Sequence, residues 1–431
     1  MNAFISGFIT FAVFVTSLFG SFIAVEAPED KTEFTPVLRF FAASDSHVGS
    51  MGDTQSLRMQ KALKMAYAIA DSDKEYNKLD AALFAGDLTD RGRKDQFLGF
   101  AVAAKSVLRE ETQLLAVIAK SHDSSTLDKG VHSYFSGVIG EDTDIHKVIN
   151  GYHFIGLSVS KTEGEHYSDY QREWLDEQLA AATAEDPTKP VFVFQHEHIS
   201  NTVYGSSDFE GWGMDDFRAV LNKYPQVVNF SGHSHYPLND PRSIWQGEFT
   251  AVGTGALYYA EFTVDDVRTY HPEGNRKVVT FWIVEVDANN RIRLRGIDMN
   301  EGEVIIEYIL DNPADPANRE YTPEKQAAKS TAPVFEADAD IKLKKQGGKY
   351  TVEVDEAKST DGMPIVLYRA FVYAEDGTLL AKTWTMPEYY IVDGEDEIVL
   401  DLGKVDAENF TVEVVAETAY GVQSAPISMK S

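Results

Sequence analysis

The chain has 431 residues, 43% of them apolar, so it is long enough to form two or three domains with sizeable cores. Asp and Glu outnumber Lys and Arg by 68 to 39, and the formal charge of −29 opposes non-specific binding to nucleic acid or anionic lipid. There is no cysteine, which excludes disulfides and thiol catalysis and weakly favours an exported protein.

The N-terminal segment indicates export. From Ala3 to Val25 the chain is uncharged and rich in Phe, Ile, Val and Leu, and residues 25–27 (VEA) offer a small-residue cleavage pattern. The run is also long enough to span a bilayer, and no basic residue precedes Lys31, so a cleaved signal, an uncleaved anchor and a buried helix all stay open. We predict that residues 1–27 are a signal peptide or membrane anchor and that the protein is secreted or at the cell surface.

The region 36–310 alternates helical and strand patterns. Apolar spacing predicts helices over 55–70, 96–108, 169–182 and 217–223, with strands at 79–83 and 113–118, whereas 126–144 has no clear period. From Phe249 to Tyr308 the pattern becomes alternating, which suits a second sheet packed on the first.

Polar side chains follow five of the apolar strand-like stretches. A carboxylate and an imidazole two residues apart at a strand end point to the same side. A second strand-end Asp beside them completes an oxygen and nitrogen pocket suited to a divalent metal, at the edge where open α/β sheets bind ligands. In chain order the motifs are Asp45-Ser46-His47, Gly86-Asp87-Leu88-Thr89-Asp90, Ser121-His122-Asp123, His196 with His198, and Gly232-His233-Ser234-His235.

The C-terminal third has a different pattern. Residues 311–333 are rich in Pro, Ala and charge without apolar periodicity, which is typical of a linker. Short alternating strands fill 334–431, with a hairpin turn at Asp376-Gly377, and predict an all-β sandwich. The closing residues 409–427 resemble the last strands of fibronectin type III domains, and we predict a spacer or adhesion module.

The motif order DxH, GDxxD, a His-Asp pair, a strand-end His and GHxH resembles the calcineurin-like metallophosphoesterase superfamily over roughly residues 39–307. The resemblance implies a four-layer α-β-β-α sandwich and two divalent metal ions, which can be Mn, Fe, Zn or Ca. The third motif departs from the family pattern. The family usually reads GNHD or GNHE where this chain has Lys120-Ser121-His122-Asp123.

The resemblance also implies the metal ligands. One ion would be held by Asp45, His47 and His235. Asp87 would bridge to the second ion, which His233 and one histidine of the fourth motif would also bind. Of that pair we favour His196 over His198, because His196 is the first polar position after Gln195 in the exit loop. Ser121 takes the place of an asparagine ligand and has a shorter reach and a weaker donor. The predicted metal ligands are Asp45, His47, Asp87, Ser121, His196, His233 and His235.

The predicted catalytic residues are His122, Asp123 and Arg91. His122, oriented by Asp123, would donate a proton or hydrogen bond to the leaving oxygen. Arg91 and Asp90 fit phosphate-clamping or supporting roles. The alternatives are a surface ion pair for Arg91, helix N-caps for Asp45 and Asp87, and satisfied core residues for the histidines.

We therefore predict a metal-dependent phosphoesterase that hydrolyses an extracellular phosphomonoester or phosphodiester by attack of a metal-bound hydroxide. Its substrate would be a small-molecule or polymeric phosphate ester, and its C-terminal domain would make a possible cell-surface contact. The departure at Lys120 and Ser121 leaves reduced activity open, as well as a different class of function, a cell-surface binding or adhesion protein with a degenerate, structural metal site. Several polar and aromatic residues form a candidate substrate platform or pack loops on the sheet: Asn201, Tyr204, Trp212, Tyr236 and Trp245.

Overall fold

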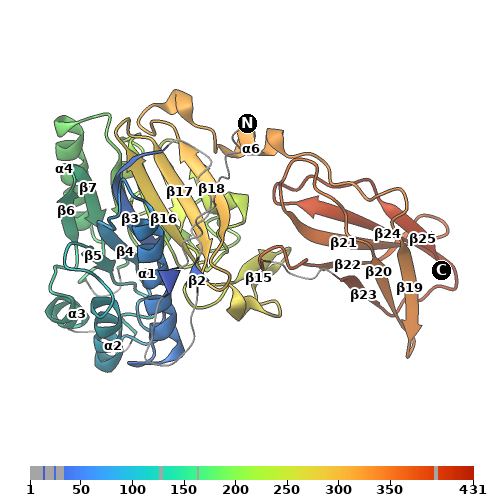
Figure 1. Cartoon of the computed structure of the whole chain (residues 1–431). Coiled ribbons are helices and arrows are strands. Elements are labelled where there is room, and N and C mark those ends of the chain that lie inside the picture. The colour runs from blue at the N-terminus through green and yellow to red at the C-terminus, as the bar shows by residue number, and fades with distance from the viewer. Residues whose placement is uncertain (1–12, 15–23, 26–33, 126–129, 163–164, 393–396) are drawn as a thin grey trace, which may run out of the picture.

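The computed structural model describes residues 13–14, 24–25, 34–125, 130–162, 165–392 and 397–431. Figure 1 shows a large α/β region followed by an all-β region, which is drawn in orange and red. The predicted export segment lies outside the described residues, except that β1 (Val13–Phe14) pairs antiparallel with β2 (Ala24–Val25). None of the helices that the structure describes is both long and apolar enough to cross a membrane.

The α/β region is built on two six-stranded sheets. In the first sheet β3 pairs parallel with β4 and β4 with β5, whereas β16, β17 and β18 continue it antiparallel on the other side of β3. Its strands, in spatial order, are β18 (Val304–Leu310), β17 (Ile292–Asp298), β16 (Thr280–Asp287), β3 (Pro36–Ala43), β4 (Ala81–Ala85) and β5 (Gln113–Val117).

The second sheet faces the first. Its central strands β7, β8, β11 and β13 are parallel neighbours, and an antiparallel strand lies at each edge. Its strands, in spatial order, are β12 (Ile244–Gln246), β13 (Thr250–Gly253), β11 (Val227–Ser231), β8 (Val191–Phe194), β7 (Tyr152–Gly156) and β6 (Ile145–Ile149).

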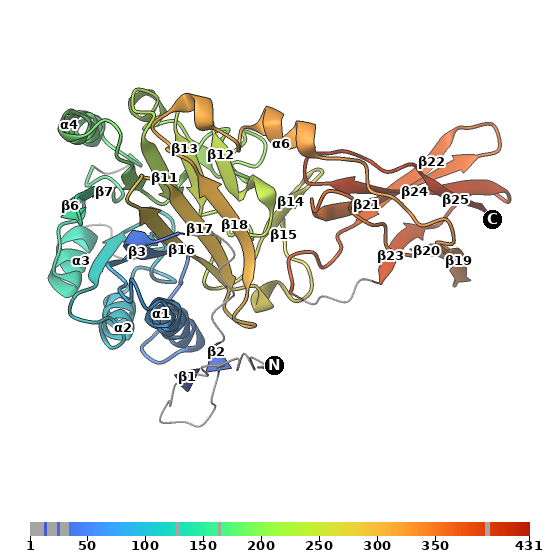
Figure 2. The ribbon, with the colours of Figure 1, turned by 45° about the horizontal axis from the view of Figure 1, so that its top comes forward.

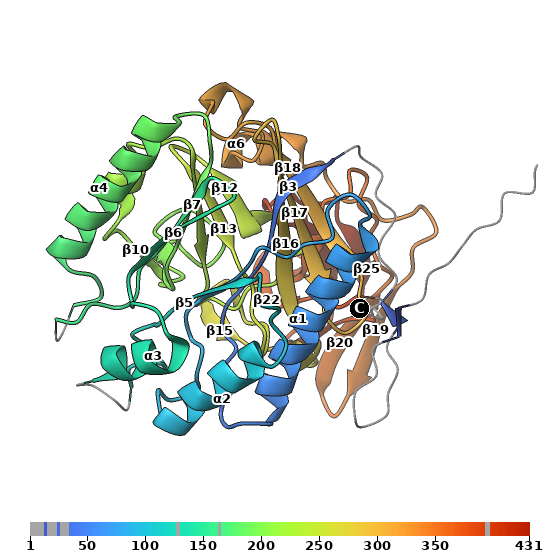
Figure 3. The ribbon, with the colours of Figure 1, turned by 60° about the vertical axis from the view of Figure 1, so that its left-hand side comes forward.

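Helices cover the outer faces of both sheets, which confirms the four-layer sandwich. The core between the sheets joins side chains such as Phe40 and Phe192, whose rings lie 4.9 Å apart. Figure 3 shows the sheets between α4 on one side and α1 and α2 on the other. The first sheet carries α1 (Thr54–Ser72), α2 (Lys94–Lys105) and α3 (Val131–Ile139), and the second carries α4 (Asp169–Glu185) and α5 (Arg218–Leu221).

One expectation from the sequence is wrong, and one segment without a clear apolar period contains a helix. The strands of 280–310 do not form a second sheet, because β16 pairs with β3 and extends the first one, with Trp282 opposite Ala42. The segment 126–144, which shows no clear period, contains α3. Glycines bound this short helix on both sides, and it buries Val131, Phe135 and Ile139 at helical spacing.

The C-terminal region is an all-β sandwich of antiparallel sheets, as predicted. Its core lies between the two sheets and includes Val352, Tyr368 and Val412. One sheet has β19 (Ile341–Gln346), β20 (Lys349–Val354) and β23 (Ile398–Gly403), and the other has β22 (Leu379–Thr385), β21 (Ile365–Ala374), β24 (Phe410–Thr418) and β25 (Ile427–Lys430). The likeness to fibronectin type III stays a prediction.

The segment predicted as a linker is ordered against the α/β region. It contains η3 (Pro316–Asn318) and α6 (Pro323–Lys329), which Thr322 caps by accepting a hydrogen bond from the Lys325 amide. Its Tyr321 amide donates to the Gln246 side chain at 3.0 Å, and the Gln246 amide donates back to the Tyr321 carbonyl at 3.0 Å. The chain therefore passes between the regions along the edge of the second sheet.

Candidate metal centre

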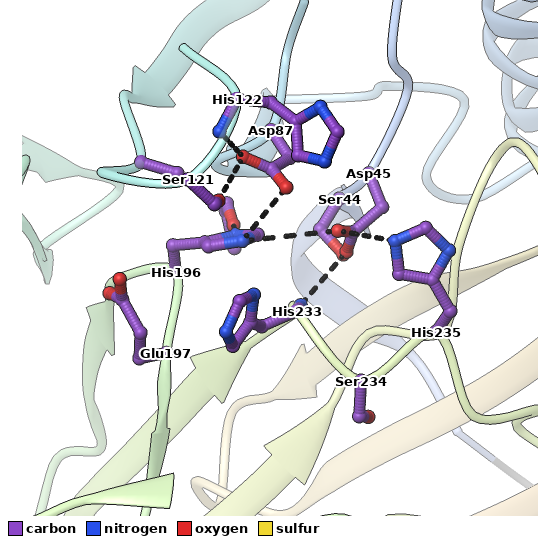
Figure 4. Close-up of polar contacts among 12 residues, drawn as sticks. Ser44, Asp45, Asp87, Ser121, His122, His196, Glu197, His233, Ser234 and His235 are labelled. Carbon is purple, nitrogen blue, oxygen red and sulfur yellow. Dashed lines mark hydrogen bonds and ion pairs between the residues drawn. The ribbon is translucent and has the colours of Figure 1, made fainter. Parts of the chain in front are cut away.

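The polar ends of four strands meet in one place. The loops after β3 and β4 bring in residues from the first sheet, and those after β8 and β11 bring in residues from the second. Figure 4 shows Asp87, Asp45 and His196 pointing toward one another, with His233 and His235 beside them. The site thus lies where the carboxyl ends of the central strands of two facing sheets converge.

Asp45, His47 and His235 form the first ligand group. Their ligand atoms all lie within 4.8 Å of one another. His235 Nε2 is 3.1 Å from Asp45 Oδ1 and 3.1 Å from His47 Nε2. The other ring nitrogen of His235 lies 3.1 Å from the Tyr259 carbonyl oxygen, so it donates there and leaves Nε2 as the ligand atom.

Asp87, His196 and His233 form the second ligand group, again within 4.8 Å. His196 Nε2 lies 3.2 Å from Asp87 Oδ2, and its Nδ1 lies 2.9 Å from the Ala85 carbonyl oxygen. The two groups are adjacent, since His196 Nε2 is 3.9 Å from Asp45 Oδ1 and His47 Nε2 is 4.0 Å from Asp87 Oδ2. This arrangement provides two neighbouring positions for cations, with Asp87 between them.

Two buried atoms of the site make no hydrogen bond, although each has an ion-pair contact with another ligand residue. They are Asp45 Oδ1 and His196 Nε2, which belong to different ligand groups. A buried polar atom left without a partner is costly, and a cation coordinated there would satisfy both. Carboxylate oxygen and imidazole nitrogen suit Mn, Fe or Zn, so the residues present fit the divalent metals that the resemblance implies.

The charges of the site favour a cation. Burial alone would raise the pKa of Asp87, but His196 and His47 hold it well below its usual range. Burial, followed by the nearby His235, lowers the pKa of His47 to about 3. Burial would also lower the pKa of His196, but Asp87 and Asp45 raise it well above its usual range. A bound cation would replace that proton as the partner of the two carboxylates.

The backbone at this site is strained. Asp45, His47, Asp87, His233 and His235 all have φ between 46° and 76°, in the left-handed region that favours glycine. Such conformations cost on the order of 1–3 kcal/mol each and concentrate at functional sites. Because strand direction alone would not aim these side chains at one point, the left-handed turns supply the convergence.

Two glycines allow the close approach of these loops. A Cβ on Gly86 would lie 2.6 Å from the Cβ of His196, and one on Gly232 would lie 2.5 Å from Asp45 Oδ2. Neither contact is possible for real side chains. The glycines of the second and fifth motifs are therefore required by packing at the site.

Ser121 lies in the site, where its side chain contacts the ligand residue Asp87. Its hydroxyl donates to Asp87 Oδ1 at 2.7 Å, and the His122 amide donates to the same oxygen at 3.2 Å. This geometry makes Ser121 a support for Asp87, and its role as a metal ligand stays a prediction.

His122 lies at the rim of the centre and is half-buried. Its ring is 4.4 Å from that of His47, and its ligand atoms group with those of His47 and Asp90 within 4.8 Å. The sequence argument that Asp123 orients His122 is wrong, because His122 Nδ1 contacts the Asp90 carbonyl oxygen at 2.7 Å.

Asp123 instead turns into the loop of the second motif. It is fully buried and accepts hydrogen bonds from the amides of Leu88, Thr89 and Ala119. Burial, with the nearby charge of Asp87, raises the pKa of Asp123 to about 7. Asp123 therefore fixes the loop that carries Asp87. Its position next to His122 in the sequence could not reveal this role.

Arg91 is exposed beside the site. Its side chain is 74% exposed, and its guanidinium pairs with Asp90 at 3.2 Å. This is the surface ion pair that the sequence left as the alternative, and a phosphate-clamping role for Arg91 stays a prediction.

The geometry favours His196 over His198 as a ligand. Both ring nitrogens of His198 already contact serine hydroxyls, those of Ser231 and Ser234, at 2.7 Å. The pKa of His198 is lowered to about 3 by burial and by the nearby His233, so it is a neutral, satisfied core residue.

The sequence missed two supports of the centre. Ser44 donates to Asp45 Oδ2, and the Tyr259 carbonyl orients His235. A serine directly before the first motif was visible in the sequence, whereas a backbone carbonyl leaves no signal there.

The candidate substrate platform is only partly at the site. Tyr204 and Tyr236 pack on each other in a buried cluster, with ring centroids 4.1 Å apart, so these two residues pack loops. The ring centroids of Trp212 and His233 are 4.9 Å apart. The ring centroid of Tyr258, which the sequence argument did not include, lies 5.6 Å from that of His47. Aromatic rings thus flank both ligand groups.

Residues 38–237 match the family model described as calcineurin-like phosphoesterase. This part of the chain is similar to calcineurin-like phosphoesterase domains, and we refer to the α/β region as the phosphoesterase domain. The match covers all five motifs and confirms the first of the two resemblances seen in the sequence.

A curated relative carries the name "Probable cyclic nucleotide phosphodiesterase", from Rhodococcus erythropolis. It is 29% identical over 194 residues, which cover 43% of this chain and 60% of the relative. The chain thus aligns with less than two thirds of that relative's length.

Three solved structures are similar to this chain. Purple acid phosphatase PPD1 from yellow lupin is 13% identical with a TM-score of 0.44, covering 66% of this chain and 55% of that one. PhoD is 11% identical with a TM-score of 0.41, covering 68% and 72%. GAP50 of Plasmodium is 14% identical with a TM-score of 0.40, covering 64% and 89%.

Proposed function

We propose that this chain is a metal-dependent phosphoric ester hydrolase that cleaves a small phosphodiester. The observation that carries the proposal is the pair of adjacent Asp/His groups, in which one buried atom of each group, Asp45 Oδ1 and His196 Nε2, makes no hydrogen bond and has other ligand atoms as its ion-pair contacts. Two such groups, with ligand atoms of one 3.9 and 4.0 Å from those of the other, match the ligand sets of two-metal phosphoesterases.

Different residues of the chain would support different parts of the reaction. Divalent ions bound by the two groups would lower the pKa of a water molecule and neutralise phosphate charge. Asp87 holds the groups together, and Ser121 and the His122 amide keep its carboxylate in place. Because Nδ1 of His122 donates to the Asp90 carbonyl, Nε2 is the ring nitrogen that would donate to the leaving oxygen.

The substrate class rests on charge and on the rings beside the site. The formal charge of −29 repels polymeric phosphates, which favours a small ester. Trp212 and Tyr258 flank the ligand groups and provide faces for a planar leaving or retained group. The name of the Rhodococcus relative agrees with a phosphodiester of a nucleoside.

We extend the proposal to location and to the C-terminal domain. The apolar N-terminal run and the absence of cysteine support action outside the cytoplasm. The sandwich of three and four antiparallel strands supports a fibronectin type III-like domain.

The alternative of a binding protein with a structural metal site is not favoured. A structural site encloses its ion with a complete ligand set. Here the half-buried His122 and the exposed Arg91 leave one side of the centre accessible to a ligand.

The test uses the purified chain without its first 27 residues. We expect it to hydrolyse bis-aryl phosphate faster than mono-aryl phosphate with Mn²⁺, to lose activity to a chelator and to regain it when metal is restored. His196→Gln should abolish the rate, whereas His146→Gln, at a histidine on β6, should retain it. If the chain binds metal but shows no turnover with Mn²⁺, Zn²⁺, Fe²⁺ or Ca²⁺, the proposal is wrong.

A further inference from the structure

The C-terminal β-sandwich packs on the phosphoesterase domain close to the metal centre. A buried apolar cluster joins Tyr236 and Phe262 of the first region with Leu367 and Tyr390 of the second. Figure 2 shows the hairpin of β14 (Phe262–Val264) and β15 (Val267–Tyr270) beside β21 of the sandwich. The two regions therefore share a core at this hairpin.

The segment that leads into this hairpin holds the metal ligand His235. The Tyr259 carbonyl oxygen lies 3.1 Å from His235 Nδ1, and the Glu261 amide donates to the His235 carbonyl at 3.2 Å. The rings of His235 and Tyr259 are 4.3 Å apart. Since β14 begins at the next residue, Phe262, a shift of β14 would move the groups that orient His235.

Two adjacent tyrosines of the sandwich fix the start of β14. Tyr390 lies 4.8 Å from the ring of Phe262, and Tyr389 lies 6.1 Å from it. Tyr390 is 4% exposed, and its hydroxyl donates to the Glu273 carbonyl at 3.3 Å. Phe262 is fully buried beneath them.

Tyr389 also contacts the chain directly after His235. The Asn239 side chain donates to the Tyr389 carbonyl at 2.6 Å, and the Tyr389 hydroxyl donates to Asp240 at 3.2 Å. Asp240 is fully buried and also accepts two hydrogen bonds from the Arg242 guanidinium and one from the Arg242 amide. Tyr389 therefore contacts both the segment just after His235 and the start of β14, and Tyr390 contacts the start of β14.

Polar contacts close the edge of this interface. Arg369 of β21 pairs with Asp265 in the β14–β15 turn at 2.7 Å and with Glu417 of β24 at 2.8 Å. The Tyr420 hydroxyl donates to the Pro241 carbonyl at 3.4 Å. The interface therefore has a buried aromatic centre and a hydrogen-bonded rim, which are features of fixed packing.

We propose that Tyr389 and Tyr390 are positioning residues for His235, so that the β-sandwich is part of the hydrolytic unit and not a spacer. The inference rests on the proposed function, because it assigns His235 to the metal centre. Groups that orient a metal ligand typically contribute about 10- to 100-fold in metal affinity or activity. The two tyrosines act one contact further out, so we expect an effect at the lower end of that range.

The test compares tyrosine substitutions inside and outside the interface in the full-length chain. Tyr390→Ala should weaken Mn²⁺ binding at one of the two sites about 10-fold in a calorimetric titration and lower kcat by a similar factor. The matched control is Tyr350→Ala, because Tyr350 packs on Phe410 inside the sandwich. Tyr350→Ala should lower the unfolding temperature and leave Mn²⁺ affinity unchanged. Tyr389→Phe, which loses only the hydroxyl bond to Asp240, should show a smaller loss.

Metal affinity decides the outcome independently of turnover. If Tyr390→Ala binds Mn²⁺ as tightly as the parent, the positioning role is wrong and the sandwich is a spacer. If Tyr390→Ala does not fold, Tyr389→Phe and Asn239→Ala decide by the same titration, with unchanged affinity in both overturning the proposal. A parent chain that binds Mn²⁺ without hydrolysing phosphate esters would contradict the proposed function alone.

Discussion

The phosphoesterase domain and the β-sandwich fill the left-handed backbone region with different residues. At the metal centre it is occupied by two aspartates and three histidines: Asp45, Asp87, His47, His233 and His235. Among the described residues of the sandwich only glycines have such φ values, for example Gly377 at 85°. All eleven histidines of the chain also lie before residue 272.

The difference separates turns that only reverse the chain from turns that aim side chains. Glycine adopts positive φ without steric cost, so the sandwich makes its hairpins at little expense in stability. The strand ends of the phosphoesterase domain keep side chains where glycine would be easier, because those side chains must converge. Of the ten described non-glycine residues with such φ values, five lie at the candidate site, and all the histidines among them are there.

The largest effect is expected from a change of Asp87, which connects the two ligand groups. Asp87→Asn removes the negative charge between them, and we expect Mn²⁺ affinity and the hydrolysis rate to fall more than about 100-fold, beyond the loss of an ordinary supporting contact. Metal titration and the bis-aryl phosphate assay would measure both. Asp71→Asn, which removes an exposed ion pair with Arg109, is the matched control and should change neither. Retained cooperation of two metals in Asp87→Asn would show that Asp87 does not bridge.

The same glycine substitution should have different effects in the two regions. Gly86 and Gly377 have φ values of 82° and 85°, but a Cβ would meet His196 at Gly86 and has nothing within 4 Å at Gly377. Gly377→Ala should cost only backbone strain of about 1–2 kcal/mol in unfolding free energy and leave activity unchanged. Gly86→Ala should add a displaced His196 and reduce activity roughly 10- to 100-fold. Equal activity of the two variants would contradict the close packing of the metal loops.

The third motif offers a substitution expected to increase activity. Lys120→Gly combined with Ser121→Asn restores an amide oxygen that can reach the second metal, and we expect Mn²⁺ affinity and rate to rise about 10-fold. Ser121→Ala, which loses the 2.7 Å bond to Asp87, should lower both. If the double variant is no better than the parent, the site either uses another ligand or does not need a second metal.

The smallest expected effect concerns the rim of the interface between the regions. Burial alone would raise the pKa of Glu417, but hydrogen bonds from Arg369 and Gln423 lower it below its ordinary value of 4.5. Such a carboxylate stabilises the folded state at pH values above its ordinary pKa of 4.5. The stabilisation is lost as the pH falls through the lower pKa of the folded state. Thermal unfolding should show Glu417→Gln less stable than the parent near neutral pH, by about 1 kcal/mol or less, and equal to it in acid.

The sequence by itself determined the ligand types and their order along the chain. Each motif directly follows an apolar run, so strand ends and candidate ligands were visible without knowing which strands pair. The long helices were also predictable from apolar spacing, whereas the short α3, enclosed by Gly130 and Gly140, was not. The alternating pattern after the phosphoesterase motifs predicted a β-sandwich for the same local reason.

Only the tertiary structure decided which groups meet. Alternation identifies β16 as a strand, but its pairing with β3 joins segments far apart in the chain and placed it in the first sheet. Asp123 follows His122 in sequence yet turns to the amides of Leu88 and Thr89, because neighbouring side chains in a turn need not face the same way. The contact of Tyr389 and Tyr390 with the segments that hold His235 likewise depends on how two separately predicted regions pack, which no local pattern encodes.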